Sequence, residues 1–364
     1  MTKPDTFIAD SVKASLFAKT NEDVAAYAII DGQWCEDIYG RLLGAQNTDW
    51  CGLIAGEVAH ELALTAPYLV RLEPDSDLTN WLIDEGWGNG WGIYFLASKS
   101  RAKELYKTPP PESMEQQIAR GAFVASPDIS EDDATDVVLL RRHFRRYLRV
   151  EFESDGRLVR FRFFDPAVLR VWLLSCNPLE AGAFFGPVTD FIAEDWCEEP
   201  GLCHPHRLWH FAAPAHGEPC KGGIFDMRTR QLTPMSSFPE SSSQTNDRPK
   251  GPLTLIRKAQ ERAFEDMQWE FLVEQITQEL AEKNVQHGEP NYTRKQLRSF
   301  TREHVSKARE FSLNEFSCVH RFVLWVAAGG GEHLENDQLI AYLQNSEIPE
   351  FERLSFCEDL VRGL

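Results

Sequence analysis

The sequence is short of positive charge. Against 56 Asp and Glu residues it has 38 Lys and Arg, which gives a formal net charge of −18 at pH 7. Binding to a phosphate backbone or to anionic lipid needs a basic surface, so this balance argues against a duplex nucleic-acid partner and against a membrane partner. It is compatible with a basic protein partner or with solubility alone.

Apolar runs long enough to cross a membrane are also missing. A spanning helix needs about 18 or more apolar residues in succession, and no such run occurs. Residues 1–13 are polar and do not resemble an export signal. We therefore expect a cytoplasmic protein whose eight cysteines stay mostly reduced. Most of these cysteines lie among apolar residues and are expected to be small buried side chains, namely Cys35, Cys51, Cys176, Cys318 and Cys357.

The common catalytic motifs are absent as well. No Gly-x-Ser-x-Gly, His-Glu-x-x-His or Gly-x-x-x-x-Gly-Lys sequence occurs. The nearest approach to a metal site is a group of thiols and imidazoles between residues 197 and 220, but it has no Cys-x-x-Cys pair and no usual zinc spacing. We expect a surface loop there, with structural zinc as the alternative, and we expect no catalytic residue, metal or cofactor. The group consists of Cys197, Cys203, His204, His206, His210, His216 and Cys220.

Residues 148–173 carry the clearest local pattern in the chain. Residues 148–152 predict a strand, Asp155-Gly156 predicts a turn, and apolar and polar residues alternate from Val159 to Phe163, as on a strand with one buried face. Asp165-Pro166 then predicts a helix start, because the Asp side chain accepts hydrogen bonds from the first turn, where Pro is tolerated. The sequence therefore predicts a hairpin followed by a helix.

The same region resembles a known family. His143-Phe144-Arg145, Asp155-Gly156 and Phe161-Arg162-Phe163-Phe164-Asp165-Pro166 together resemble the type VI secretion effector chaperones, adaptor proteins that carry toxic effectors to the VgrG spike. Further matches extend the resemblance to roughly residues 24–210; they are Ala28-Ile29-Ile30-Asp31-Gly32, Ala66-Pro67-Tyr68-Leu69-Val70-Arg71-Leu72 and Trp91-Gly92-Ile93-Tyr94-Phe95. The resemblance implies a non-enzymatic cytoplasmic adaptor that binds a cognate effector and loads it onto VgrG. It adds no metal.

Strand and helix patterns alternate between residues 25 and 97, which favours an α/β arrangement. We expect an α/β (α+β) domain with a mixed sheet and flanking helices at residues 24–235, after an N-terminal segment (1–23). A Pro-rich and acidic insertion interrupts this domain at residues 99–133. Residues 188–192 are expected to form an edge strand, and residues 197–220 to be irregular.

The last third of the chain has a different pattern. Residues 236–252 are rich in Ser and are expected to be a linker. Beyond them the apolar period changes to that of helices, so residues 253–364 predict an all-α helical bundle. Thr293 is expected to open one of its helices, and Ser312 with Glu315 is expected to form a capping box that opens the next.

A partner-binding surface is predicted from arginine and tryptophan, which are enriched at protein interfaces. Arg141 and Arg145 belong to a basic cluster on the helix expected at residues 134–147, and Arg160 and Arg162 share a strand face. The alternative is that the strand arginines pair with Asp165 or neighbouring acids. Trp87 lies in a Gly-rich loop, where it is either an exposed anchor or part of the core. The complete set of candidates is Arg141, Arg145, Arg160, Arg162, Asp165 and Trp87.

Two other functions remain open at this stage. The Cys- and His-rich segment would suit a metal-dependent hydrolase, and the chain would also suit a structural subunit of an assembly. If the chain is an adaptor, either domain could meet the effector and either could meet the spike.

Overall fold

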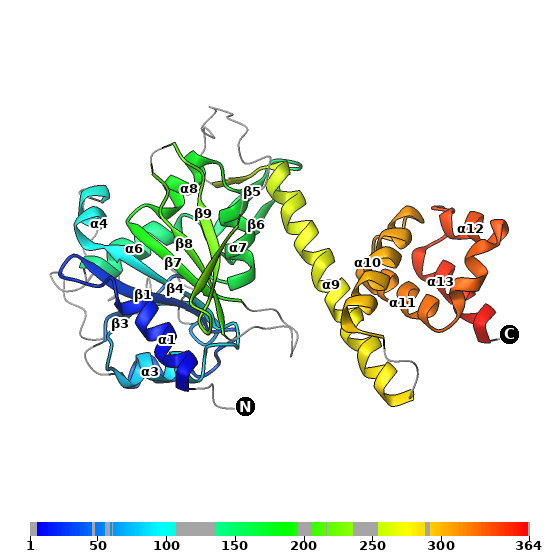
Figure 1. The fold of residues 1–364 in the computed structure, drawn as a ribbon. Helices are drawn as coiled ribbons and strands as arrows, with labels where there is room; N and C mark the ends of the chain where they lie inside the picture. Colours follow the sequence, from blue (N-terminus) through cyan, green and yellow to red (C-terminus); the bar gives the residue numbers. More distant parts are fainter. Residues whose placement is uncertain are drawn as a thin grey trace. The chain divides into compact units, whose positions relative to one another are not determined.

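The structure is a computed structural model that describes residues 6–45, 48–54, 59, 61–106, 135–195, 206–215, 217–235, 254–287 and 292–362. The chain divides into two compact units, Met1–Phe264 and Glu265–Leu364 (Figure 1). The linker expected at residues 236–252 and most of the insertion expected at 99–133 lie outside the described residues.

The first unit is built on an eight-stranded sheet with the order β10-β9-β8-β7-β4-β1-β3-β2. All its pairings are antiparallel. The strands are β1 (Val24–Asp31), β2 (Trp50–Gly52), β3 (Pro67–Leu72), β4 (Gly92–Ser98), β7 (Val188–Glu194), β8 (Arg207–Ala212), β9 (Lys221–Asp226) and β10 (Gln231–Met235).

Two expectations about this sheet were wrong. The main sheet is antiparallel rather than mixed, and β7 is an interior strand between β4 and β8 rather than an edge strand. The physical reason is the continuation of the sheet through β8, β9 and β10, in a region that was expected to be irregular up to residue 220. Gly222-Gly223 in β9 and Pro234 in β10 interrupt the period-2 pattern, and three large residues in succession, Trp209-His210-Phe211, obscure it in β8.

Helices cover both faces of the sheet. Along β1, Tyr27 and Ile29 face one core and Ala28 and Ile30 face the other, as the alternation of a strand requires. The first core is closed by α6 (Thr135–Arg145), α7 (Pro166–Ser175) and α8 (Pro178–Phe185), and the second by α1 (Thr6–Phe17), α2 (Ile38–Gly44) and α3 (Asp77–Asp84). Figure 1 shows α1 and α3 on one side of the sheet. The expected N-terminal segment therefore contains a helix that covers the sheet.

The hairpin predicted at residues 148–164 is confirmed, but it belongs to a second, smaller sheet. Its strands β5 (Arg149–Phe152) and β6 (Leu158–Arg160) pair antiparallel, and Gly156 in the connecting turn has a φ of +71°. A third strand, β11 (Thr254–Ile256), pairs parallel to β5. The parallel pair makes this small sheet mixed, and Val150 and Ile256 bury its inner face in the first core.

The second unit is helical, as expected. It contains most of α9 (Lys258–His287), followed by α10 (Arg294–Glu310), α11 (Phe316–Ala327), the 3₁₀ helix η3 (Gly330–Glu335), α12 (Asp337–Gln344) and α13 (Glu350–Arg362). These helices enclose one apolar core that includes Ile276, Phe322 and Leu354. None of the helices in the described part of the chain is both long and apolar enough to cross a membrane.

The ends of these helices agree only in part with the sequence patterns. Thr293 opens α10 through a capping box with Gln296. The box expected from Ser312 and Glu315 does not form, because the Glu350 carboxylate accepts the N–H groups of Asn314 and Glu315 instead.

The helical domain was expected to begin at residue 253. In the structure, β11 and the first two turns of α9 belong to the first unit, where Phe264 packs against Phe161.

Candidate partner-binding surface

Two motifs that are far apart in the sequence meet at the end of β1. Arg162 donates a hydrogen bond from Nη2 to Oδ2 of Asp31 at 2.6 Å, across a separation of 131 residues. Asp31 is only 2% exposed, and its Oδ1 accepts the N–H of Gln33 at 3.0 Å. A buried carboxylate needs such a partner, because an unpaired charge in the interior costs several kcal/mol. Asp31 and Arg162 therefore hold the end of β1 against the segment that leads into α7.

Gly32 brings a third segment to the same place. Its N–H donates to the carbonyl oxygen of Ala66 at 3.0 Å. A Cβ at this position would lie 2.8 Å from the Ala66 oxygen and 2.9 Å from the Leu64 oxygen, closer than side-chain carbons approach oxygen. Glycine is therefore needed for the two backbones to touch. This contact places residues 61–66 beside the Asp31–Arg162 ion pair.

Large apolar side chains are exposed on these adjoining segments. Trp34 is 41% exposed and Leu64 is 65% exposed. The guanidinium carbon of Arg162 lies 6.0 Å from the centroid of the Trp34 ring, within the range of a cation–π contact. We define the Trp34 patch as Trp34, Leu62, Leu64 and Arg162. Tryptophan and arginine side by side at an exposed position are typical of the residues that dominate binding at protein interfaces.

The strand arginines have different surroundings, although the sequence placed them together. Strand β6 ends at Arg160, so Arg162 lies beyond it and is half-buried by its pairing with Asp31. Arg160 is exposed and lies directly opposite Arg149 across the hairpin. The sequence left open whether these arginines bind a partner protein or pair with acidic residues of the same chain. Arg162 does pair with an acidic residue, Asp31. Arg160 remains a candidate for binding.

Asp165 has a structural role. Its Oδ1 accepts the N–H groups of Ala167 at 2.8 Å and Val168 at 3.3 Å, so it caps α7 as the sequence predicted. Burial raises the pKa of this carboxyl, and the two backbone N–H groups oppose that rise.

Trp87 is not an exposed anchor. It is 3% exposed, and its ring lies 5.8 Å from that of Tyr94 in the second core. The Gly-rich loop around it is held by the buried carboxylate of Glu194, which accepts the N–H groups of Gly88 and Gly90. The glycines that suggested a free loop instead allow the backbone to wrap around this carboxylate.

The basic cluster of α6 divides between the interior and the surface. Arg141 is 5% exposed, and its Nε donates to the Gly52 carbonyl oxygen at 2.8 Å. Burial lowers the pKa of Arg141 to about 10. The expectation that Arg141 contacts a partner was therefore wrong, because it connects α6 to β2. Arg145 is exposed, and it forms no ion pair with any described residue.

His143, which belongs to the motif, forms a buried polar cluster that the sequence did not reveal. Its Nδ1 lies 2.8 Å from the Tyr106 hydroxyl and 3.0 Å from Nη2 of Arg146, and its Nε2 lies 2.7 Å from the Phe184 oxygen. Because the carbonyl can only accept, Nε2 carries the proton and Nδ1 accepts. Gly186 must lack a Cβ, which would lie 2.3 Å from the imidazole Cε1. This cluster joins α6 to α8.

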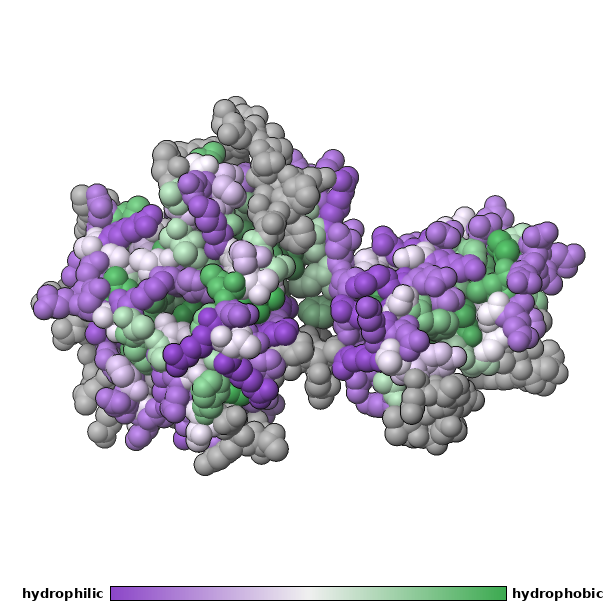
Figure 2. Space-filling view, in the orientation of Figure 1, coloured by the Kyte–Doolittle hydropathy of each residue, from purple (hydrophilic) through white to green (hydrophobic). Residues whose placement is uncertain are grey.

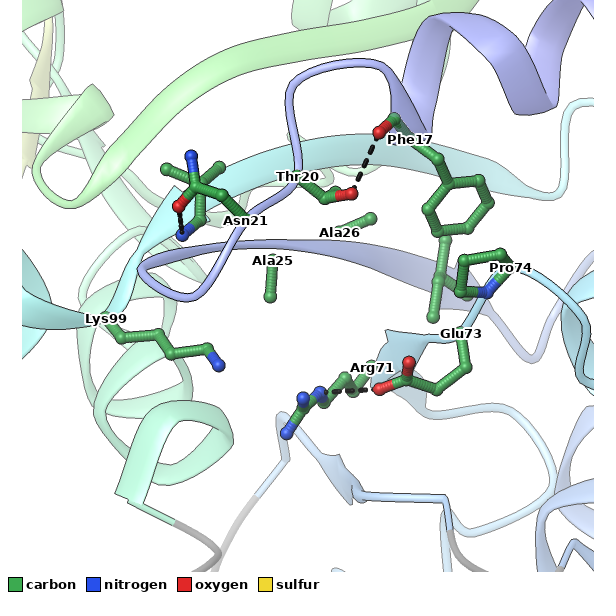
Figure 3. Close-up of a pocket in the computed structure, with 11 residues that line it drawn as sticks. Phe17, Thr20, Asn21, Ala25, Ala26, Arg71, Glu73, Pro74 and Lys99 are labelled. Carbon is green, nitrogen blue, oxygen red and sulfur yellow. Dashed lines mark hydrogen bonds and ion pairs between the residues drawn. The ribbon is translucent and has the colours of Figure 1, made fainter.

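A shallow hollow of about 210 Å³ lies at the other end of β1 (Figure 3). Figure 3 shows Phe17 and Pro74 on one side, and Lys99 and Arg71 on the other. Arg71 is already occupied, since its Nε lies 3.0 Å from Oε1 of Glu73. The hollow mixes apolar, acidic and basic groups without a single chemical preference. We therefore give the Trp34 patch precedence as the candidate site.

The described members of the Cys- and His-rich segment do not converge. His210 lies 2.8 Å from Asp190, His206 lies 3.8 Å from Asp226, and Cys220 is buried. No grouping of three potential metal ligands occurs among the residues that the structure describes. The other members, Cys197, Cys203, His204 and His216, lie outside that part.

The sequence of this chain was compared with known protein families, and a family matches part of it. The family described as "Domain of unknown function (DUF4123)" matches residues 26–108 and 110–183. No curated protein and no solved structure matches the chain. Asp31 and Trp34 lie in the first matched segment, and Arg162 lies in the second. The Trp34 patch is therefore built from a region similar to a family that is associated with type VI secretion effector adaptors.

Proposed function

We propose that this protein is a non-enzymatic adaptor that binds a cognate toxic effector in the cytoplasm and loads it onto the VgrG spike. Two findings support the proposal. The matched family is associated with such adaptors, and the motifs that resemble the effector chaperones lie within the matched segments. The proposed partners are proteins, with no part for nucleic acid, membrane, metal or cofactor.

The observation that carries the proposal is the construction of the Trp34 patch. Asp31 and Arg162 come from different matched segments and form a buried ion pair. Removing two charges from water costs free energy, so such a pair adds little net stability compared with apolar residues of similar size. What the pair does provide is a fixed position for the Arg162 guanidinium against the exposed ring of Trp34. A fixed aromatic and arginine pair is suited to recognising another protein.

The composition of the surface agrees with this assignment. Figure 2 shows hydrophilic residues over much of the visible face of each unit, with smaller hydrophobic areas between them. Trp34 and the leucines of the adjoining segment, Leu62 and Leu64, are exposed apolar side chains, and groups of exposed apolar side chains can mark interaction sites.

The test is capture of partners from native cytosol with tagged full-length protein, followed by mass spectrometry. We expect a VgrG-type spike protein and one large toxin-like protein to be retained. The double change Trp34→Ala with Leu64→Ala should reduce capture of at least one of them by about tenfold or more, as is typical of interface anchors. Leu232→Ala with Leu179→Ala is the matched control, because these leucines are 55% and 51% exposed elsewhere on the first unit.

One result would refute the function and another would refute the choice of the patch. If the wild-type protein retains neither class of partner, the adaptor function is wrong. If capture survives the change at Trp34 and Leu64, the function stands and the patch has been misplaced. Thermal unfolding of each variant separates loss of binding from loss of the fold.

A further inference from the structure

Strand β6 forms an edge of the small sheet. Among the described residues it pairs with β5 alone. The N–H of Phe161 donates to the Leu148 oxygen, and the N–H of Phe152 donates to the Arg157 oxygen, at 3.0 Å each. Because hydrogen-bonded and non-hydrogen-bonded pairs alternate in an antiparallel ladder, Arg149 and Arg160 form a non-hydrogen-bonded pair. The main-chain N–H and C=O groups of Leu158 and Arg160 therefore point away from β5, toward the open edge.

Two like charges lie directly opposite each other on this hairpin. Residues in a non-hydrogen-bonded pair have Cα atoms only about 4.5 Å apart, so the side chains of Arg149 and Arg160 leave the sheet close together. Both are exposed, and neither forms an ion pair within the described ranges. Directly opposed like charges destabilise a strand pair. Glu151 shares this face, two residues from Arg149, but its Oε1 lies toward the turn, 3.7 Å from the position of a Cβ on Gly156, and among the described residues it forms no ion pair with either arginine. The two arginines therefore place positive charge on this face of a chain with a net charge of −18.

The same outer face also has an apolar side chain. Leu158 is two residues from Arg160 and therefore shares its face, where it is 57% exposed. Val159 points the other way and packs against the first core. The edge thus presents main-chain hydrogen-bonding groups, an exposed leucine and two guanidinium groups that form no ion pair with a described residue. Charged side chains can also serve to keep an edge from pairing, and binding of a strand-forming peptide distinguishes the two roles.

We propose that β6 binds an extended acidic segment of a partner protein, which adds to the small sheet as a further strand. The main chain of this segment pairs with Leu158 and Arg160, and its carboxylates meet the guanidinium groups of Arg149 and Arg160, which can bind carboxylates bidentately. The inference rests on the proposed adaptor function, since it names the chemistry of one partner. It concerns a surface defined by residues other than those of the Trp34 patch.

The test uses full-length protein and a fluorescein-labelled peptide in which glutamate and valine alternate, with fluorescence anisotropy as the readout. We expect saturable binding at about 50 mM NaCl that weakens at about 300 mM, because exposed charges are screened by salt. A peptide with lysine in place of glutamate should not bind. A peptide N-methylated at every residue should bind at least about tenfold more weakly, because it cannot donate the strand hydrogen bonds in either orientation.

A pair of charge reversals provides the matched control. Arg149→Glu with Arg160→Glu should weaken binding of the acidic peptide by about tenfold or more. Arg228→Glu with Arg230→Glu makes the same change in net charge at exposed positions in the turn after β9 and should leave binding unchanged.

The inference is overturned if the wild-type protein does not bind the acidic peptide, if both double variants bind it equally, or if N-methylation has no effect. The last result would leave β6 as an edge protected by charge. Capture of partners from cytosol separates this failure from failure of the function. If the Arg149→Glu, Arg160→Glu variant retains every partner that the wild type retains, the adaptor function stands and the edge is not its binding site.

Discussion

The ion pair between Arg162 and Asp31 allows a quantitative test of the candidate site. Replacing Arg162 by methionine removes the partner of a carboxylate that is 2% exposed. Breaking a buried pair in this way costs about 3–5 kcal/mol, because one charge is left in the interior. A change of 1 kcal/mol lowers the Tm of a unit of this size by roughly 2–4 °C, so Arg162→Met should lower it by roughly 6–20 °C.

A double-mutant cycle shows whether the charge is the cause. Asp31→Asn combined with Arg162→Met removes both charges, so it should cost much less than the sum of the two single changes. Arg160→Met is the matched control, because this arginine is exposed and should shift the free energy of unfolding by no more than about 0.5 kcal/mol. Calorimetry gives the Tm, and urea denaturation followed by tryptophan fluorescence gives the free energy.

The reasoning is refuted if Arg162→Met behaves like Arg160→Met, or if the effects of the single changes at Asp31 and Arg162 simply add. Either result would mean that water reaches the pair and that the position of Arg162 does not depend on Asp31. The arrangement of the Trp34 patch would then have lost its support.

Two further predictions concern protonation. Burial lowers the pKa of His143 to about 3, below the value of about 6.5 in an unfolded chain, so its contribution to stability is complete above pH 6.5 and is lost as the pH falls toward 3. We expect NMR of histidine-labelled protein to show one Nε2-protonated imidazole that does not titrate between about pH 5 and 8; titration near pH 6.5 would contradict its burial. Burial raises the pKa of Asp190, but hydrogen bonds from His210 and Lys19 outweigh this and hold it at about 2. Asp190→Asn should therefore cost about 2 kcal/mol above pH 5 and progressively less as the pH falls from 5 to 2; urea denaturation across this range checks it, and a cost independent of pH would refute it.

Local structure follows from the sequence wherever neighbouring residues decide it. The hairpin, the Asp165 cap of α7 and the Thr293 cap of α10 were predicted because each depends on residues within a few positions of one another. The capping box expected at Ser312 does not form, because a residue far away in the sequence intervenes. Glu350, from a later helix, accepts the N–H of Glu315 that the Ser312 side chain would have accepted.

Pairings between distant segments were not predictable in this way. The alternation around Arg162 shows which way its side chain points but not that Asp31, 131 residues away, receives it. Trp87 was a candidate anchor because glycines flank it, and only the fold brings Glu194 under that loop. The exposed position of Trp34 was missed, although the polar residues that follow Asp31-Gly32 offered a signal.

Strand β11 has a consequence for the order of events during synthesis. The small sheet of the first unit is completed late, because β11 and residues 258–264 are translated about 100 residues after the hairpin that they join. Until they leave the ribosome, β5 has an open edge and Ile256 is missing from the first core. A nascent chain halted before residue 254 would therefore show an unfinished sheet to its surroundings, at a stage when exposed edges invite wrong pairing. The first unit is therefore complete only when synthesis of the second unit begins.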